Sequence, residues 1–230
     1  MIKISHIVPN CLNTLTEKYS DLHLLLLHWA MKSPEYLQFF VNSKSYKILD
    51  NSFYELQTAA NVPDLLHYAE KLKVDEVVAP DVMYDRETTI KLTELFIKQN
   101  AGRFKVQAVV CGKEYEDLID CFHYFNEHSR IDVIAISKHG FKVPGKSFLQ
   151  CRQEFLQSIE YFSKKPIHLL GINSISELYY PYSSYVRSID SKFMAKLAHG
   201  DKIDLHTKLN DSSKKLFNKL CMRFKKMEGK

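Results

Sequence analysis

The sequence has no apolar run long enough to cross a membrane. A membrane-spanning helix needs about 18 or more consecutive apolar residues, and the longest candidate, LHLLLLHWAM, is interrupted by His23 and His28. The first residues, MIKISHIVPN, also lack the apolar core of a secretory signal peptide. We therefore expect a cytoplasmic protein that has no membrane partner.

Cysteine is sparse as well. The chain has five cysteines, an odd number, and none of them forms a CxxC pair. This spacing favours reduced thiols over a disulfide framework and offers no cysteine pair for zinc. His23 and His28 have no clear acidic or histidine partner at ligand spacing, so they do not predict a metal site. The sequence predicts neither a metal nor another cofactor.

Glycine-rich signals are missing too. No repeat, Gly/Ser-rich linker or low-complexity tract interrupts the 230 residues, a length sufficient for one sizeable core. Neither GxGxxG nor GxxxxGK[ST] follows any apolar run, so the usual phosphate loops of an open doubly wound sheet are absent. We expect one domain over residues 1–230 and keep the open sheet as the second structural interpretation.

What the sequence does contain is a regular alternation of strand-like and helix-like segments. Apolar runs at 4–9, 22–29, 46–50, 75–80, 104–110, 131–137, 167–172 and 185–190 predict strands. Helical patterns lie at 34–42, 63–73, 86–99, 114–125, 148–162 and 174–180 and near the C-terminus, with Ile90, Leu95 and Phe96 expected to face the core. Strict alternation indicates a parallel sheet covered on both faces. About eight strands just close a barrel, so we predict a compact (β/α)8 TIM-like barrel.

Three aspartates stand where predicted strands end: Asp50 in YKILD, Asp81 after DEVVAP and Asp190 in YVRSID. The carboxyl ends of parallel strands converge on one mouth of a barrel, where such folds keep their chemistry. Three acids there indicate a site for a nitrogenous base or a cation, with one acid free to act as nucleophile. The alternative for each is a helix N-cap, although Ser191 can cap in place of Asp190.

The net charge of +5 and a pI near 8.8 are mildly basic, which permits a polyanionic partner without requiring one. Basic residues concentrate late, around a C-terminal segment of residues 201–230 that we expect to be helical. They are Lys192, Lys196, Lys202, Lys208, Lys214, Lys215, Lys219, Arg223, Lys225 and Lys226. The pattern is typical either of a surface that faces nucleic acid or of a solvated terminal helix.

Six strand-end motifs follow one another over residues 46–200: ILDNSFYE, EVVAPD, KVQAVV, DVIAIS, IHLLGI and VRSID. In this order they resemble the motifs of the tRNA-guanine transglycosylases and their DNA-modifying relatives, barrel enzymes that exchange guanine for a 7-deazaguanine. The family's DSGGFQ motif corresponds to residues 50–55, its LD motif to Pro80 and Asp81, and the glutamine of VQGG to Gln107. Its YLMGVG strand corresponds to residues 168–173 and its nucleophile motif to residues 186–190.

The resemblance implies base exchange through a covalent aspartyl-glycosyl intermediate. The catalytic residue Asp190 would attack the sugar C1′ and expel guanine, which divides one difficult exchange into two easier steps. Asp81 would bind the N1 and amino edge of the base, and Asp50 would do the same or manage protons. The other base-binding residues would be Gln107 at the carbonyl edge, Tyr54 by stacking, Asn51, Gly171 and Ser137. A structural hydrogen bond for Gln107 and simple packing for Tyr54 stay open as alternatives.

The chain departs from the family pattern on either side of the nucleophile. Ser137 and Lys138 replace two glycines, so Lys138 would touch a phosphate or the base. Lys192, Lys196 and His199 stand where the family carries arginines and would bind phosphate as point charges.

Family members that act on tRNA carry a CxCxxC and histidine zinc site beyond the nucleophile, whereas this sequence has only Cys221 there. The barrel thus lacks the family's zinc subdomain, and DNA is favoured over tRNA as the substrate. The chain then resembles most the minimal family relatives that belong to virus-encoded DNA-modification systems, which would act in the host cytoplasm.

Other functions stay open at the level of sequence. They are a tRNA-directed transglycosylase, a non-catalytic nucleic-acid-binding accessory subunit, and an unrelated small-molecule barrel enzyme that uses the three acids on a metal. Retention of Asp190 argues against the accessory subunit. The expected partners are nucleic acid and a 7-deazaguanine base, and a homodimer or a partner subunit is left open.

Overall fold

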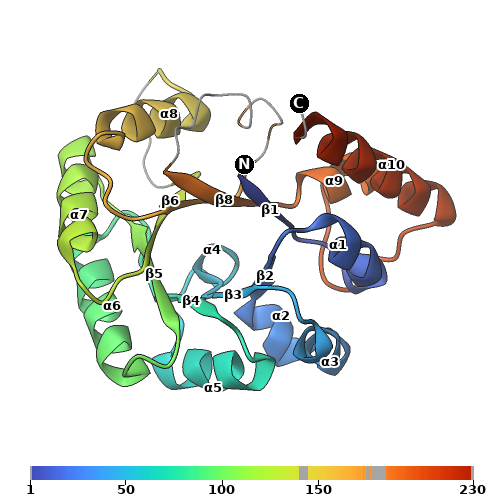
Figure 1. The fold of residues 1–230 in the computed structure, drawn as a ribbon, viewed down its shortest axis with the longest axis horizontal. Coiled ribbons are helices and arrows are strands. Elements are labelled where there is room, and N and C mark those ends of the chain that lie inside the picture. The colour runs from blue at the N-terminus through green and yellow to red at the C-terminus, as the bar shows by residue number, and fades with distance from the viewer. Residues whose placement is uncertain (1, 140–144, 173, 175–176, 178–184, 229–230) are drawn as a thin grey trace.

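The computed structural model describes residues 2–139, 145–172, 174, 177 and 185–228 and contains a nearly closed barrel of eight parallel strands (Figure 1). The strand order is β1-β8-β7-β6-β5-β4-β3-β2. The predicted (β/α)8 fold is confirmed, and each strand overlaps its predicted run. The strands are β1 (Lys3–His6), β2 (His23–Leu26), β3 (Lys47–Asp50), β4 (Glu76–Val78), β5 (Lys105–Val110), β6 (Val133–Ser137), β7 (Ile167–Leu170) and β8 (Val186–Ser191).

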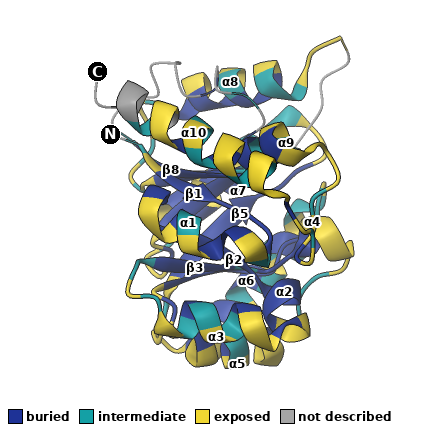
Figure 2. Cartoon of the chain, turned by 90° about the vertical axis from the view of Figure 1, so that its right-hand side faces the viewer, coloured by how far each residue is buried: buried dark blue, intermediate teal, exposed yellow. Residues whose placement is uncertain are grey.

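Helices surround the barrel and turn their exposed residues outward, while the strands are buried (Figure 2). No helix in the described part of the chain is long and apolar enough to span a membrane. The helices are the 3₁₀ helix η1 (Asn10–Leu12), α1 (Asn13–Tyr19), α2 (Leu27–Lys32), α3 (Pro34–Asn42), α4 (Phe53–Leu56), α5 (Val62–Leu72), α6 (Arg86–Asn100), α7 (Tyr115–Glu127), α8 (Phe148–Ile159), α9 (Phe193–His199) and α10 (Asp211–Glu228).

The apolar run at 22–29 is not one strand. Strand β2 ends at Leu26, and α2 begins at the next residue, Leu27. A run that is apolar at every position carries no periodicity, so it does not reveal where strand becomes helix. The helix expected at 174–180 and the motif residue Asn173 lie outside the described residues, except for positions 174 and 177.

Helix α6 corrects one predicted core residue. Leu95 is 44% exposed, whereas Thr89, Thr93 and Phe96 are fully buried. Positions 89, 93 and 96 follow the spacing of one helical face, and Leu95 lies outside it. The prediction for Leu95 was therefore wrong, because the buried face of the helix includes two threonines and leaves this leucine outside.

The barrel closes between β1 and β2 with the help of side chains. Asp21 N–H donates to the Ile4 carbonyl (2.9 Å), and Ile4 N–H donates to Asp21 Oδ2 (3.0 Å). Further along, Leu24 N–H donates to the Ser5 hydroxyl (2.8 Å). Side-chain oxygens thus satisfy backbone donors that a continuous strand ladder would otherwise pair.

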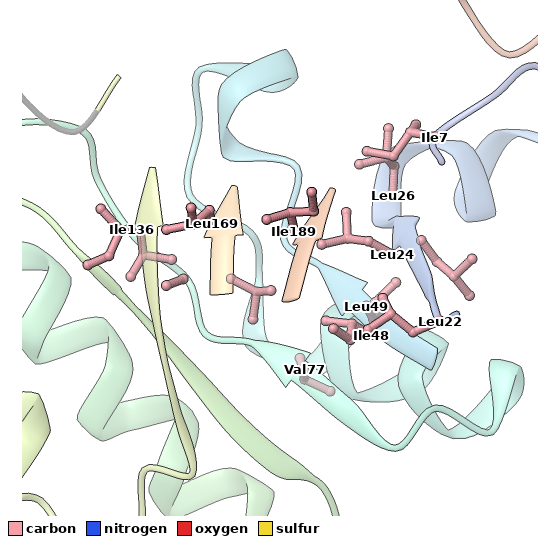
Figure 3. Packing of buried hydrophobic residues seen from close by; sticks show 14 of the residues in the cluster. Ile7, Leu22, Leu24, Leu26, Ile48, Leu49, Val77, Ile136, Leu169 and Ile189 are labelled. Carbon is pink, nitrogen blue, oxygen red and sulfur yellow. The ribbon is translucent and has the colours of Figure 1, made fainter. Parts of the chain in front are cut away.

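Apolar side chains fill the space within and around the strands. Figure 3 shows labelled members of this core from β2, β3, β4, β6, β7 and β8, such as Leu24, Ile48, Val77 and Leu169. Helix α10 packs beside α1 and α9 (Figure 1) and buries Phe217. The lysines at 215 and 219 of that helix are exposed, so much of its basic face is solvated.

A β-bulge between β7 and β8 decides which way the end of β8 faces. Ile167 pairs with Val186, but the next residue, His168, pairs with Ser188, so Arg187 is the extra residue. Because side chains alternate along a strand, a shift of one residue exchanges the two faces. The bulge therefore places Ser188, and with it Asp190, on the face of the sheet that carries His168.

A buried carboxylate on β4 holds the bulged arginine. Arg187 Nη1 and Nη2 donate to the two oxygens of Glu76 (2.7 and 3.0 Å), and the Tyr46 hydroxyl donates to Glu76 Oε2 (2.8 Å). The Glu76 side chain is 0% exposed and that of Arg187 is 22% exposed. This bidentate pair joins β8 to β4 at the N-terminal end of the barrel. The guanidinium of Arg187 neutralises the charge of the buried Glu76 carboxylate.

Breaking this pair from the arginine side should be costly. We expect Arg187→Met to lower the free energy of unfolding by about 3–5 kcal/mol, because it leaves a buried carboxylate without its counter-charge. The double variant with Glu76→Gln should recover part of that loss. Urea unfolding measures the free energies of the single and the double variant.

Arg103→Met is the matched control, because it removes the half-exposed pair with Glu70. It should lower the free energy of unfolding by about 1 kcal/mol or less. Equal losses in Arg187→Met and Arg103→Met would contradict the structural role of the buried pair.

Candidate active site

A cavity of about 200 Å³ opens at the carboxyl ends of the strands. The three aspartates share it, as their positions at strand ends predicted. The predicted site residues that line it are Asp50, Asn51, Tyr54, Asp81, Ser137, Lys138, Gly171, Asp190, Lys192 and Lys196. Side chains from five βα junctions therefore meet at one mouth.

Asp190 is 4% exposed and is held by the protein through one oxygen. Its Oδ1 accepts a hydrogen bond from Gly171 N–H (3.0 Å) and lies 3.2 Å from His168 Nε2. Among the described residues, no donor reaches Oδ2. The Ser191 hydroxyl accepts from Phe193 N–H (2.9 Å), the first backbone donor of α9, so Asp190 is not used for this contact. The second oxygen of Asp190 is thus left for the cavity.

Gly171 is needed for its backbone conformation. Its φ is +68°, in the left-handed region where a side chain is strained. A Cβ at this position would meet no atom within 4 Å, so crowding by the protein does not explain the glycine. The conformation allows the Gly171 N–H to reach Asp190.

Asp81 lies in the loop after β4 and is held by two neighbours. Asn51 Nδ2 donates to Asp81 Oδ1 (2.7 Å) and to the Ala79 carbonyl (2.7 Å), while the Cys111 thiol lies 3.5 Å from Asp81 Oδ2. Burial raises the pKa of Asp81 to about 6, against the lowering effect of these hydrogen bonds. Both amide hydrogens of Asn51 are engaged, so this side chain positions Asp81 and the loop.

Asp50 ends β3 and accepts a hydrogen bond from Ser52 N–H (2.8 Å). Burial raises the pKa of Asp50 well above its ordinary value, and the negative charges of Glu55, Asp190 and Asp81 raise it further. Its surroundings thus favour the protonated form of Asp50. Asp50 and Asp190, two carboxyl groups with different surroundings, share the cavity.

Short helix α4 carries Tyr54 to the rim of the cavity. Tyr54 is 58% exposed, and its ring stacks on that of His139 with centroids 5.1 Å apart and planes 11° apart. The edge of His139 contacts Phe148 (centroids 4.7 Å apart). An exposed aromatic surface at the mouth is thus available for stacking on a flat ring.

Positive charge lies around the acidic centre. Lys192 donates to Glu55 Oε1 (2.9 Å) and lies over the Trp29 ring. Lys138 and Lys196 line the cavity wall, where burial, followed by the charges of Arg152 and Lys196, lowers the pKa of Lys138. Two lysines that repel each other favour an anionic group between or beside them.

Two predicted residues lie apart from the cavity wall. Gln107 is fully buried on β5, on the same face as Val109, which does line the cavity. Neither Oε1 nor Nε2 of Gln107 has a hydrogen-bond partner among the described residues, so the expected structural hydrogen bond is not found there. His199 is exposed at the end of α9 and does not line the cavity.

The sequence analysis gave no role to His168 or to Glu55. His168 is fully buried between Ser188 and Asp190, with its Nδ1 2.8 Å from the Ser188 hydroxyl. A signal for it did exist, because a polar residue inside the apolar run IHLLGI raises the same question as Gln107 in KVQAVV. Glu55 stands within the first motif, but nothing local indicated its pairing with Lys192.

No group of His, Cys, Asp and Glu among the described residues is arranged to hold a metal ion. His23 does have an acidic partner, since its Nε2 lies 3.2 Å from Glu17 Oε1. The six-residue separation and the intervening turn hid this pair from the sequence analysis. The pair explains a buried histidine as part of the packed structure.

A scan against models of protein families found no match to this chain, and a search of curated proteins found none either. The relation to the transglycosylases therefore rests on the strand-end motifs. The chemistry has to be argued from the cavity itself.

The raised pKa of Asp81 predicts a gain of stability on neutralising this residue. Below pH 3.8 the carboxyl is protonated in both folded and unfolded chains, and above about pH 6 it is ionised in both. The wild-type protein thus loses stability as the pH rises between these values. The free energy of unfolding of Asp81→Asn should exceed that of the wild type by about 3 kcal/mol at pH 8, and the two should be similar at pH 4. Urea unfolding at both pH values measures this. The control Asp85→Asn, at the N-cap of α6, should show no such gain, since hydrogen bonds from Thr88 lower the Asp85 pKa.

Proposed function

We propose that the protein is a nucleic-acid guanine transglycosylase that replaces guanine by a 7-deazaguanine base. The observation that carries the proposal is the arrangement of charge in the cavity. Asp50, Asp81 and Asp190 form its acidic centre, and Lys138 and Lys196 lie on its wall. A guanine ring presents hydrogen-bond donors on one edge and is attached to a phosphate backbone, which matches acids within and lysines around them.

The size of the cavity supports a single base as the bound group. Ligand pockets for drug-sized molecules measure about 300–1,000 Å³, whereas this cavity measures about 200 Å³. One flat bicyclic ring is the appropriate size for such a space. The sugar and phosphates of the target strand would then lie at the mouth, near Lys138 and Lys196.

The proposed recognition uses the carboxylate of Asp81 as acceptor for the N1 and amino hydrogens of the base. Asn51 keeps Asp81 in place through the hydrogen bond from its amide to Asp81 Oδ1. The buried amide of Gln107 has no partner among the described residues, but it lies outside the cavity wall. We therefore assign it no contact with a base in this cavity.

In the first step Asp190 Oδ2 attacks C1′ of the target nucleotide. The Oδ2–C1′ bond forms, the C1′–N9 bond breaks, and the bonding electron pair leaves with guanine, which takes the proton held by Asp50. In the second step the incoming base gives a proton to Asp50 and attacks C1′, which releases Asp190. The two steps balance in atoms and charge and divide the exchange through a covalent ester.

The proposal favours DNA over tRNA as the polymer, on the ground of the sequence alone. The cysteine–histidine zinc motif of the tRNA-acting family members does not occur between Asp190 and Lys230. A purely accessory role is less well supported, because the cavity retains a nucleophilic carboxylate held by two polar contacts. Both alternatives are outcomes of the first test below.

Incubation with a guanine-containing oligonucleotide and no incoming base should give a covalent adduct that survives denaturation. We expect Asp190→Asn to abolish the adduct, because the amide keeps the shape of the side chain but loses the nucleophilic charge. Denaturing gel electrophoresis with single-stranded DNA, duplex DNA and tRNA side by side measures the labelling.

Binding of the same oligonucleotide by the Asp190→Asn variant is the control for correct folding. An adduct in that variant would refute the assigned nucleophile. Labelling of tRNA alone would overturn the DNA preference and leave the chemistry standing. Binding without any adduct in the wild type would support the accessory role.

The affinity for a free 7-deazaguanine should depend on pH through Asp81. The base needs the carboxylate form, whereas the raised pKa leaves the empty site protonated below about pH 6. We expect the affinity to fall by about tenfold per pH unit below that value and to level off above pH 7. Calorimetric titration from pH 5 to 8 measures it. Asp81→Asn should bind weakly and without this pH dependence; a wild-type affinity that rises on acidification would contradict the role.

A further inference from the structure

A continuous line of hydrogen bonds runs through the barrel from its N-terminal end to the nucleophile. Arg187 pairs with the buried Glu76, and its Nε also donates to the Ser188 hydroxyl (3.1 Å). The Ser188 hydroxyl lies 2.8 Å from His168 Nδ1, and His168 Nε2 lies 3.2 Å from Asp190 Oδ1. His168 and Ser188 are fully buried, so water cannot readily replace a partner.

The two ends of this line fix the direction of the bonds between them. A guanidinium can only donate, so the Ser188 oxygen accepts from Arg187, and an ionised carboxylate can only accept, so Asp190 Oδ1 accepts from His168 Nε2. The hydroxyl hydrogen of Ser188 has no acceptor other than His168 Nδ1 among the described residues, so it donates to Nδ1. A neutral imidazole that accepts at Nδ1 carries its hydrogen on Nε2, where it faces the carboxylate of Asp190.

We propose that this relay makes His168 a positioning residue for Asp190, locking the imidazole in its Nε2–H tautomer. His168 and Gly171 together occupy Oδ1 and leave Oδ2 as the attacking atom. The bulge at Arg187 allows this relay in two ways. It provides Arg187 as the donor to Ser188, and it turns the side chains of Ser188 and Asp190 to the face of the sheet that carries His168. The effect of His168 on the rate of reaction at Asp190 rests on the proposed base exchange, whereas the tautomer of His168 does not.

The tautomer is measurable without any substrate. Protein labelled with ¹⁵N in its histidines should show one ring whose Nε2 is protonated and whose Nδ1 is an acceptor in two-bond ¹H–¹⁵N spectra. His168→Gln identifies that ring by removing its signals. Ser188→Ala should change the chemical shifts of the same ring and release it to a mixture of tautomers. A His168 protonated at Nδ1, or a tautomer unaffected by Ser188→Ala, would overturn the relay.

The positioning role is measured by the single-turnover rate of adduct formation. His168→Leu removes the donor and should slow this step by about 100-fold, as expected for a misplaced reacting group. His168→Gln can place an amide N–H near the position of Nε2 and should restore the rate to within about tenfold of the wild type. Oligonucleotide binding should change little in either variant.

A buried histidine outside the cavity provides the matched control. His23 contacts the Glu17 carboxylate at the same distance of 3.2 Å, so His23→Leu removes a comparable contact and should leave the adduct rate unchanged. Equal rates in His168→Leu and wild type would refute the positioning role. If the wild type forms no adduct while His168 shows the expected tautomer, the proposed function fails and the relay stands.

Discussion

The orientation of Asp190 depends on a single extra residue in β8. Because side chains alternate along a strand, β8 without the bulge at Arg187 would turn Asp190 toward the surrounding helices. The bulge is stabilised by the ion pair between Arg187 and Glu76, and Glu76 has no access to solvent. An ion pair at the N-terminal end of the barrel thus helps to determine which side chain of β8 reaches its mouth.

Three carboxyl groups of the same chemical type have different surroundings in this cavity. Asp190 receives hydrogen bonds on one oxygen, Asp81 accepts a hydrogen bond from Asn51 and lies near the Cys111 thiol, and Asp50 is half-buried near the charge of Glu55. These surroundings assign separate tasks to the acids without any change of residue type. Nearby lysines complement the acids, so the cavity suits a ligand with donors at one end and negative charge at the other.

The fold was predictable because its strands are buried on both faces. Each strand then appears as a short apolar run, and the helices between the runs show helical spacing. The contrast vanishes in the run at 22–29, where the strand continues into helix α2 without a polar residue at the boundary. It is also missing in α6, where Thr89 and Thr93 share the buried face and Leu95 is exposed.

By itself the sequence determined the number and order of the strands and the placement of aspartates at three strand ends, since these follow from local composition. Tertiary structure alone decided which face each aspartate takes and which partners it has. Glu76 and Arg187 are 111 positions apart in the chain, and no local pattern reveals such a pair. The elevated pKa values of Asp50 and Asp81 likewise arise from burial, to which neighbouring negative charges add at Asp50, and both causes exist only once distant segments have packed together.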